Sequence, residues 1–571
     1  MYYEANDLVV SATRNPKPLS QSAENITVIT ASEIEMMGAH TLVDVLATVP
    51  GIQVSDMGGP GLFNEFLIQD ANVNHILVMI DGVTLNFIGT PVVDITGIPI
   101  QNIERIEIVK GPGSSSWGSA LGAVINIVTK SPREDRKLGG ALSFSGGERG
   151  TRDSRAEFSG TVGRFGYYLY AGNLTSGGFR TNTDVDQNDL YAKLRWNFPQ
   201  GGSLQFTTAY DRGIAGEGDT LASYAKYLAK FRRRYLFSTL SFNYPLTDNI
   251  ELDLSLRTTY KKARDFSYFS LKKPIDQEDR ESSNGWSAKL TWWEGINTLA
   301  TGVDYDNLNI NFRPYFQRYS DKYGVFLNDT IALDDFTVTT GIRYDRMRPV
   351  DDFFSPSMGV AWNPTDKITV RAYGARGYSL PLLCPVKNSN ATQAKVTTVQ
   401  AGVETTYIPH LWLKATYFWN QLADVLETDP MTWQPVLRKQ LKQGVEVEGK
   451  TTPIFNTSLS AGYTFIEAKD RDSGQVLVNA PSQIVKLGVH YDDIRHSFRG
   501  SLLGRYVWYN ADSSLHTRDK AFIWDLNLAK KVLDYHGTDL ELFFNVHNIF
   551  NGAQYIDDDM KNARRWVEGG V

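Results

Sequence analysis

Apolar and polar residues alternate with a period of two through most of the chain beyond residue 131. The alternation is clearest in the segments 250–257, 338–345, 485–491 and 540–547. Because successive side chains of a strand point to opposite faces, each segment predicts a strand with one apolar and one polar face. A soluble β-sandwich alternates in the same way as a membrane barrel, so the connections between strands have to distinguish the two.

The connections favour the membrane barrel. Short turns recur at residues 163–166, 199–202, 245–249, 294–297, 333–336, 364–367, 408–410, 453–457, 492–495 and 535–538. Longer polar segments, such as 266–285 and 421–443, lie between them. Short turns at one end and long loops at the other are typical of outer-membrane barrels. These turns separate eleven hairpins, which predicts 22 strands. Each strand with its connection has about 20 residues, enough for the ~9–11 that a tilted strand needs to cross a membrane.

The first 130 residues follow a different pattern. Thr30 and Thr41 are each followed three positions later by an acidic residue, and these capping boxes predict two helices that end near Gly38 and Pro50. Apolar runs predict strands at residues 76–80, 103–109 and 124–128, with glycine-rich stretches between them. The pattern therefore predicts a small α+β domain ahead of the barrel.

Composition excludes several classes of protein. The chain has 58 Lys and Arg against 64 Asp and Glu, and a formal net charge of −6 argues against a general nucleic-acid binder. Aromatic residues make up 12% of the 571 residues, which suits a barrel with aromatic girdles. The sequence has no apolar run long enough for a transmembrane helix and no nucleophile–base arrangement, so we expect neither a helical membrane protein nor an enzyme. Polar residues directly follow Met1, so we expect a mature form without a signal peptide.

Four motifs in the first domain carry a family resemblance. They are residues 42–52 (LVDVLATVPGI), 78–83 (VMIDGV), 103–112 (IERIEIVKGP) and 117–130 (WGSALGAVINIVTK). In this order they resemble the plug of TonB-dependent outer-membrane receptors, and residues 545–551 (NVHNIFN) resemble the penultimate strand of that family's barrel. The family often has an Arg-Gly pair where this chain has Gln69 and Asp70. Family members usually end on an aromatic residue, so we expect the last strand, which stops at Val571, to be slightly shortened.

The resemblance implies a fold and a function. The fold is a 22-stranded antiparallel transmembrane β-barrel with an N-terminal α+β plug domain inside its lumen. We expect the TonB box and a flexible leash at residues 1–18, the plug at 19–130 and the barrel at 131–571. The implied function is TonB-dependent active import of a scarce nutrient, namely a ferric siderophore, another iron complex or cobalamin, across the Gram-negative outer membrane.

The resemblance also implies partners. They are the C-terminal domain of TonB with its inner-membrane energising complex, the nutrient ligand, and lipopolysaccharide or other outer-membrane lipid. We expect a monomer whose N-terminus is periplasmic.

Two plug elements have roles that the resemblance implies. Residues Asp7, Leu8, Val9, Val10, Ser11, Ala12 and Thr13 resemble the family's TonB box, and the alternative is a disordered tail. An extended segment of this kind can add as a strand to the edge of a partner's sheet. The missing Arg-Gly pair puts an arginine latch between plug and barrel in doubt, although Glu104, Arg105 and Glu107 could supply part of it.

The apex of the plug is the predicted ligand surface. Loops 56–66 and 84–95 should face the ligand, and we expect contacts from their apolar side chains Met57, Phe63, Phe87 and Ile88. The alternative is that these side chains pack against the barrel wall.

Two charged segments lie in predicted outer loops. Asp184, Asp186 and Asp189 could bind a structural calcium ion, since carboxylates at alternate positions suit that cation, or they could form a solvated acidic loop. A basic cluster could hold lipopolysaccharide phosphates or an anionic ligand, or be a solvated loop; it contains Lys226, Lys230, Arg232, Arg233 and Arg234. No other cofactor is expected.

Two other functions are open. One is a passive porin-like channel, which the plug argues against because a plugged lumen does not conduct. The other is a surface-docking barrel, which would need neither a leash nor a TonB box.

Overall fold

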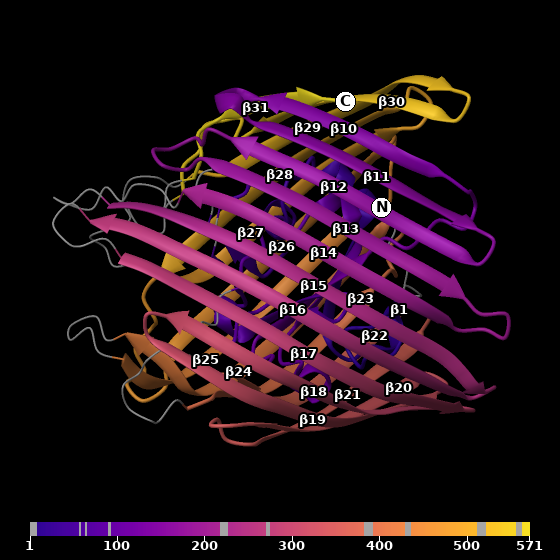
Figure 1. The fold of residues 1–571 in the computed structure, drawn as a ribbon, viewed down its shortest axis with the longest axis vertical. Coiled ribbons are helices and arrows are strands. Elements are labelled where there is room, and N and C mark those ends of the chain that lie inside the picture. Colours follow the sequence, from indigo (N-terminus) through magenta and orange to yellow (C-terminus); the bar gives the residue numbers. More distant parts are fainter. Residues whose placement is uncertain are drawn as a thin grey trace.

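The structure, a computed structural model, is a cylinder of antiparallel strands that surrounds a smaller N-terminal domain (Figure 1). It describes residues 8–55, 59–62, 65–89, 93–216, 227–269, 275–381, 392–428, 435–510, 521–554 and 562–571. No helix in these ranges is long and apolar enough to cross a membrane.

The cylinder is a closed barrel of 22 strands, as predicted. Each strand pairs antiparallel with the next, and β31 closes the ring on β10. The strands are β10 (Gly139–Gly147), β11 (Arg152–Val162), β12 (Phe165–Ser176), β13 (Val185–Asn197), β14 (Ser203–Gly216), β15 (Tyr227–Thr247), β16 (Ile250–Phe269), β17 (Ile275–Glu294), β18 (Asn297–Arg313), β19 (Phe316–Leu333), β20 (Phe336–Met347), β21 (Phe353–Thr365), β22 (Ile368–Ser379), β23 (Ala394–Thr405), β24 (Leu411–Thr428), β25 (Pro435–Thr451), β26 (Thr457–Asp470), β27 (Ala480–Asp493), β28 (Phe498–Asn510), β29 (Ile523–Tyr535), β30 (Thr538–His547) and β31 (Trp566–Gly570).

Several strands are longer than the sequence predicted. Residues 266–285 were expected to form a loop, but β16 continues to Phe269 and β17 begins at Ile275. Residues 421–443 likewise belong mostly to β24 and β25. Beyond the hydrocarbon both faces of a sheet can be polar, so the apolar signal ends while the backbone hydrogen bonds continue.

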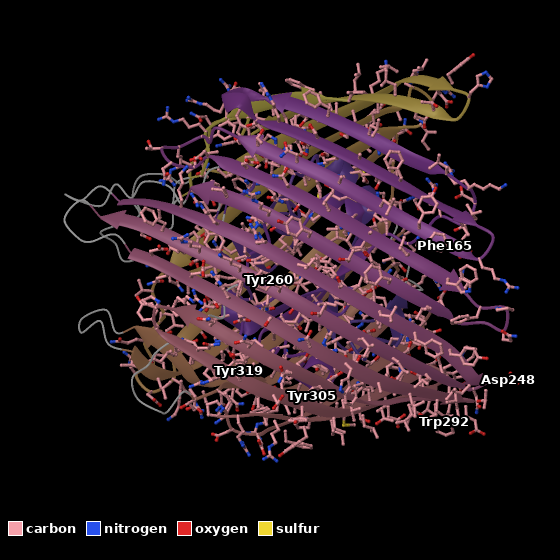
Figure 2. The ribbon with its side chains drawn as sticks, viewed as in Figure 1. Phe165, Asp248, Tyr260, Trp292, Tyr305 and Tyr319 are labelled. Carbon is pink, nitrogen blue, oxygen red and sulfur yellow. The ribbon has the colours of Figure 1, made fainter. Side chains whose placement is uncertain are left out.

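The wall has an apolar outside and a polar inside. In β20, Ile342 and Tyr344 are each 45% exposed on the outer face, whereas Arg343 and Asp345 between them are only 2% and 4% exposed inside. Aromatic side chains lie toward both ends of the barrel: Figure 2 shows Phe165 and Trp292 near the short turns and Tyr260 and Tyr319 nearer the other end. This is the arrangement that a bilayer selects.

The N-terminal domain is a mixed sheet with short helices. The sheet has the order β3-β8-β9-β6-β7, and β6 and β9 are parallel. Its strands are β3 (Asn25–Thr30), β6 (Ile76–Ile80), β7 (Val83–Thr84), β8 (Ile103–Lys110) and β9 (Ala123–Thr129). A separate two-stranded sheet pairs β4 (Ile52–Val54) with β5 (Phe66–Ile68). The 3-10 turns are η1 (Leu19–Gln21), η2 (Val73–His75) and η3 (Ile100–Asn102), with η4 (Glu148–Gly150) in the barrel.

The two predicted helices are present with their capping boxes. They are α1 (Ala31–Met36), capped by Thr30, and α2 (Leu42–Leu46), capped by Thr41; α3 (Ser114–Trp117) follows β8. Leu42, Val45 and Leu46 of α2 are fully buried in one apolar core with the sheet. The expected boundary after residue 130 falls between β9 and β10.

Candidate functional site

The N-terminal segment forms a hairpin inside the barrel. Strand β1 (Leu8–Val9) pairs with β2 (Lys17–Pro18), so Leu8 lies opposite Pro18 and Val9 opposite Lys17. Asp7, the first residue of the expected TonB box, lies outside the described residues. In the structure both plug and wall contact this segment, and the predicted flexibility of the leash stays a prediction.

Glu107 holds the TonB-box segment against the plug. One carboxylate oxygen accepts hydrogen bonds from the backbone N–H groups of Val10 and Ser11, each at 2.9 Å, and from the Ser11 hydroxyl at 2.6 Å. The Trp117 indole N–H donates to the Ser11 carbonyl at 2.7 Å. The segment therefore has its backbone groups satisfied in this state, and a partner strand would have to displace these bonds.

Arg14 connects this segment to the barrel wall. Its guanidinium lies 3.0 Å from the Asp304 carboxylate, and it stacks over the rings of Trp117 and Phe326, each 4.4 Å from the ring centroid. Arg343 shares Asp304 at 2.7 Å. One carboxylate thus joins a plug cation to a wall cation.

A cavity of about 120 Å³ lies between the plug apex and strands β16 to β20. Its charged lining has five cations, Arg14, Arg257, Lys261, Lys322 and Arg343, and three carboxylates, Glu281, Asp304 and Asp306. Lys322 makes no ion pair with any residue that the structure describes, whereas the other four cations do. The cavity therefore has positive charge available for an anionic group.

Of the four apex residues predicted to contact the ligand, the structure describes Phe87 and Ile88. Phe87 and Ile88 line this cavity, but Phe87 is buried against Tyr235, with the Lys261 ammonium 5.0 Å from its ring centroid. Ile88 packs beside Leu308. Packing against the wall, the alternative interpretation, therefore holds for both in this state, and ligand contact stays a prediction. Met57 and Phe63 lie outside the described residues.

A row of charges on β25 holds the plug to the wall. The alternate residues Lys442, Glu446, Glu448 and Lys450 point inward, and each meets a plug charge. The Lys110 ammonium lies 2.5 Å from Glu446 and 3.4 Å from Glu448; Lys442 lies 2.8 Å from Asp70, and Lys450 3.1 Å from Glu33. Charged residues at every second position of an inward face were a usable sequence signal that our interpretation missed.

The predicted latch at Glu104, Arg105 and Glu107 is therefore wrong in position. Arg105 pairs with Glu104 and Glu107 within the plug, and Glu107 faces the N-terminal segment. Arg105 and Glu107 stay within the plug because β8 is an inner strand of the plug sheet, with β3 on one side and β9 on the other. Lys110, the last residue of β8, is the one that pairs with carboxylates of the wall.

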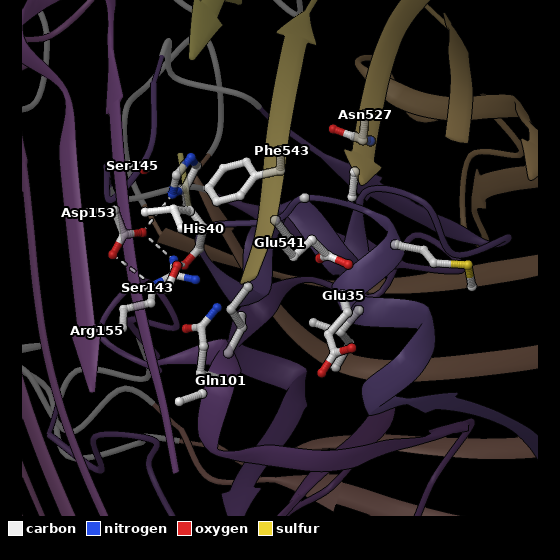
Figure 3. A pocket seen from close by; sticks show the side chains of 18 of the residues that line it. Glu35, His40, Gln101, Ser143, Ser145, Asp153, Arg155, Asn527, Glu541 and Phe543 are labelled. Atoms are coloured by element: carbon white, nitrogen blue, oxygen red, sulfur yellow. Dashed lines mark hydrogen bonds and ion pairs between the residues drawn. The ribbon is translucent and has the colours of Figure 1, made fainter. Parts of the chain in front are cut away.

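His40 forms a second contact, at the seam where the barrel closes. Its two ring nitrogens each lie 2.7 Å from a carboxylate, Asp153 on β11 and Glu568 on β31, beside a cavity of about 400 Å³ (Figure 3). Burial favours the neutral imidazole, but the Glu568 charge and the hydrogen bonds with both carboxylates outweigh it and raise the pKa of His40 to about 10. The sequence contains no motif that marks this residue.

The predicted calcium ligands do not converge. Asp186 and Asp189 point to opposite faces of β13, because their positions differ by three, an odd number, and side chains alternate along a strand. Asp184 pairs with Lys230 at 2.9 Å. Asp189 is buried inside with Gln187. These three carboxylates cannot ligate one ion in this arrangement.

Known proteins match the chain over both domains. The model of the TonB-dependent Receptor Plug Domain matches residues 18–124, and that of the TonB dependent receptor-like β-barrel matches residues 138–549. Vitamin B12 transporter BtuB of Vibrio vulnificus strain CMCP6 is 27% identical over 417 residues, 68% of this chain and 65% of that protein, which is less than two thirds of its length. The same-named protein of strain YJ016 is 24% identical over 576 residues, 96% of this chain and 91% of that protein. The unliganded ferric citrate transporter FecA has the same fold, with a TM-score of 0.82, 18% identity and 97% of both chains covered.

The fold and the matches together give the class. A closed 22-stranded barrel that contains a plug is a plugged receptor barrel of the outer-membrane type. The chain belongs to the TonB-dependent receptor family, whose members are transporters and receptors and whose barrel implies an outer-membrane protein.

Replacing Lys110 by Met tests the plug–wall latch. The change leaves Glu446 and Glu448 without their nearest buried cation, so we expect the free energy of plug unfolding to fall by about 3 kcal/mol. Lys130→Met is the matched control, because Lys130 pairs with Glu157 at a partly exposed site and should cost less than about 1 kcal/mol. Urea unfolding followed by hydrogen exchange of the β8 amides measures both. Equal losses in the two variants would contradict the latch.

The His40 contact predicts a pH dependence. A pKa raised on folding contributes stability that is complete below the unfolded value of about 6.5 and is lost as the pH rises through about 10. Plug stability should therefore fall between these values, by at most about 1.4 kcal/mol per pH unit. Thermal unfolding from pH 6 to 10 should show a weaker dependence in His40→Asn, whereas a variant of the exposed His496, His496→Asn, should follow the parent. A parent-like profile in His40→Asn would show that His40 is not the titrating group.

Proposed function

We propose that the protein actively imports a nutrient through this barrel, with energy delivered by TonB to a periplasmic N-terminal segment, and that it is not an enzyme. One observation carries the proposal: Arg14 lines the apex cavity and directly follows the segment that Glu107 holds. Arg14 therefore links the proposed ligand site to the proposed energy-coupling segment. A passive channel or a docking barrel would have no use for this connection.

The charges around Arg14 suggest how ligand binding reaches the segment. An anionic group in the cavity would compete with Asp304 for Arg14 and Arg343. Weakening the Arg14–Asp304 pair removes one of the contacts that keep residues 8–14 in place, and the population with a free segment rises. A free segment can then add as a strand to the sheet of the TonB C-terminal domain.

The substrate proposal has a leading and a second candidate. A corrinoid leads, because both relatives matched over long stretches are vitamin B12 transporters by name. A ferric siderophore is second, and the surplus of cations in the cavity, Lys322 above all, favours it because many iron chelates carry negative charge.

Equilibrium binding of cyanocobalamin and of a panel of ferric siderophores to the purified receptor separates the two candidates. If the ligand is an anionic chelate, Lys322→Met should weaken binding by about tenfold, as expected for loss of one charged hydrogen bond. Lys367→Met, in a short turn at the other end of the barrel, should bind as the parent does. Cyanocobalamin binding that is unaffected by Lys322→Met would support the corrinoid. Failure of every compound in the panel to bind would contradict the proposed substrate classes.

Val10 tests strand addition by TonB. Val10→Pro removes a backbone N–H and restricts the preceding residue, so it should abolish uptake while ligand binding at the outer face remains. Val10→Ala should be much milder, because pairing uses the backbone.

Val10→Pro also removes the hydrogen bond to Glu107, so Glu107→Gln is the necessary control. It weakens the hold on the segment without changing its ability to extend, and uptake should persist. Normal uptake by Val10→Pro at matched expression would mean that energy enters elsewhere. Equal loss in Glu107→Gln would mean that holding the segment, and not pairing with TonB, is what matters.

A further inference from the structure

Three side chains that can ligate a metal ion meet where the barrel closes around the plug. They are His40 in the loop between α1 and α2, His547 at the end of β30, and Glu568 of β31. One nitrogen of each imidazole and one carboxylate oxygen of Glu568 lie within 4.8 Å of one another. We call these three residues the seam triad, because plug and wall both contribute to it.

The pairing of the last two strands places the wall members of the seam triad side by side. Asn545 lies opposite Glu568, and His547 lies opposite Trp566. His547 and Glu568 are therefore diagonal neighbours on the inner face of the wall, close enough for long side chains to meet. The His547 ring stacks on Trp566 with 3.9 Å between the ring centroids, and this contact fixes the orientation of the imidazole.

The plug member reaches the wall because its loop lies close against the barrel. Gly38 ends α1 with a φ of +59°, a left-handed conformation that favours glycine. A Cβ at this position would come within 2.7 Å of the Asn527 side chain on β29, so a larger residue would push the loop inward. His40 follows two residues later, and its Nε2 points at Glu568, 2.7 Å away.

The other ring nitrogen of His40 already has the partner that a metal ligand needs. Its Nδ1 lies 2.7 Å from the Asp153 carboxylate, which also pairs with Arg155 (Figure 3). A ligating imidazole almost always donates its second N–H to a carboxylate or a carbonyl, which fixes the tautomer and makes the first nitrogen a better ligand. Asp153 would hold the Nδ1 proton in this way and leave Nε2 to the ion.

The spacing of the ligand atoms is close to that around a zinc ion. Atoms about 2.0–2.1 Å from a tetrahedral zinc ion are about 3.3 Å from one another. The Nε2 atom of His547 lies 3.4 Å from a Glu568 oxygen, which is long for a hydrogen bond but fits two ligands of one ion. The Nε2 atom of His40 lies 2.7 Å from that oxygen, so the ion requires a separation of about 0.6 Å more.

We propose that the seam triad binds one divalent transition-metal ion of the zinc type, which joins the plug to the barrel wall. Two imidazoles and one carboxylate are a ligand set that zinc favours, and they leave a fourth position for water. A cavity of about 80 Å³, lined in part by His40, His547 and Trp566, has room for that water. Mg²⁺ and Ca²⁺ prefer shells made mostly of oxygen, so the seam triad should discriminate against both.

The ion replaces the proton that lies between His40 and Glu568. Its double charge then faces the Glu568 and Asp153 carboxylates, and binding releases a proton from Nε2 of His40. Because the ligands come from both plug and wall, the ion binds only when the two are in contact, and it therefore strengthens the hold on the plug. The pH dependence predicted above for His40 applies to the metal-free receptor. The seam triad shares no residue with the apex cavity, so this proposal does not rest on the proposed nutrient.

Calorimetric titration of the full-length receptor with Zn²⁺ tests the site. The receptor is purified in detergent without a histidine tag and treated with a chelator, and we expect one ion bound per chain. His547→Phe keeps an aromatic ring against Trp566 but removes both nitrogens, and it should weaken binding by at least about 100-fold. The matched control is His496→Phe in a short turn, where the side chain is 69% exposed. The control should bind Zn²⁺ as the parent does.

Two measurements on the unaltered receptor need no variant. Co²⁺ should give the strong visible absorption of a four-coordinate ion, and one equivalent of Zn²⁺ should abolish it. At a Zn²⁺ concentration 100 times the dissociation constant, amide exchange in residues 37–47 should slow by about 100-fold, since the loop must leave the ion to open.

Several results would overturn the proposal. They are the absence of stoichiometric Zn²⁺ binding by the parent, parent-like affinity in His547→Phe, and an equal loss of affinity in His496→Phe. A weak Co²⁺ spectrum of the six-coordinate type would also overturn it, as would binding of Ca²⁺ or Mg²⁺ as tight as that of Zn²⁺. Unchanged amide exchange on binding would show that the ion does not join the plug to the wall.

Discussion

The plug is a folded domain that must be held inside the barrel, and the inner face of the barrel wall is largely polar. Strand alternation gives most apolar side chains of the wall to the bilayer, so apolar contacts between wall and plug are confined to local clusters, such as Tyr168, Tyr170, Tyr191 and Phe237 against the plug core. Buried ion pairs hold the plug elsewhere, among them Lys110 with Glu446 and Arg233 with Asp94. Such pairs contribute little net stability, but losing one partner is costly. They therefore fix the position of the plug more than they add to its stability.

The same logic applies to the N-terminal segment. Its backbone N–H groups bond to Glu107, and Arg14 is attached to the wall through Asp304. Val9 and Ala12 add apolar contacts with the plug, so freeing this segment breaks both polar and apolar contacts.

Alternation also gives neighbouring residues of one strand unrelated roles. Arg232 and Arg234 are exposed on the outer face of the wall, and Arg233 between them joins the plug to the wall. Asp186 and Asp189 are separated in the same way. Consecutive like residues in a barrel strand therefore lie alternately on the two faces of the wall. On each face, their neighbours are residues of the adjacent strands.

The sequence by itself determined the strand number, the capped helices α1 and α2, and a small α+β domain ahead of the barrel, because these follow from local periodicity, turns and caps. That this domain is a plug was implied by the family resemblance of its motifs. It did not determine where the strands end outside the membrane, since polar residues on both faces carry no periodic signal. It also did not reveal that His40 meets Asp153 and Glu568, or that Lys110 meets Glu446. Those partners are hundreds of residues apart or lie on different walls of the lumen. Only closure of the barrel around the plug decides which buried charges come within reach of one another.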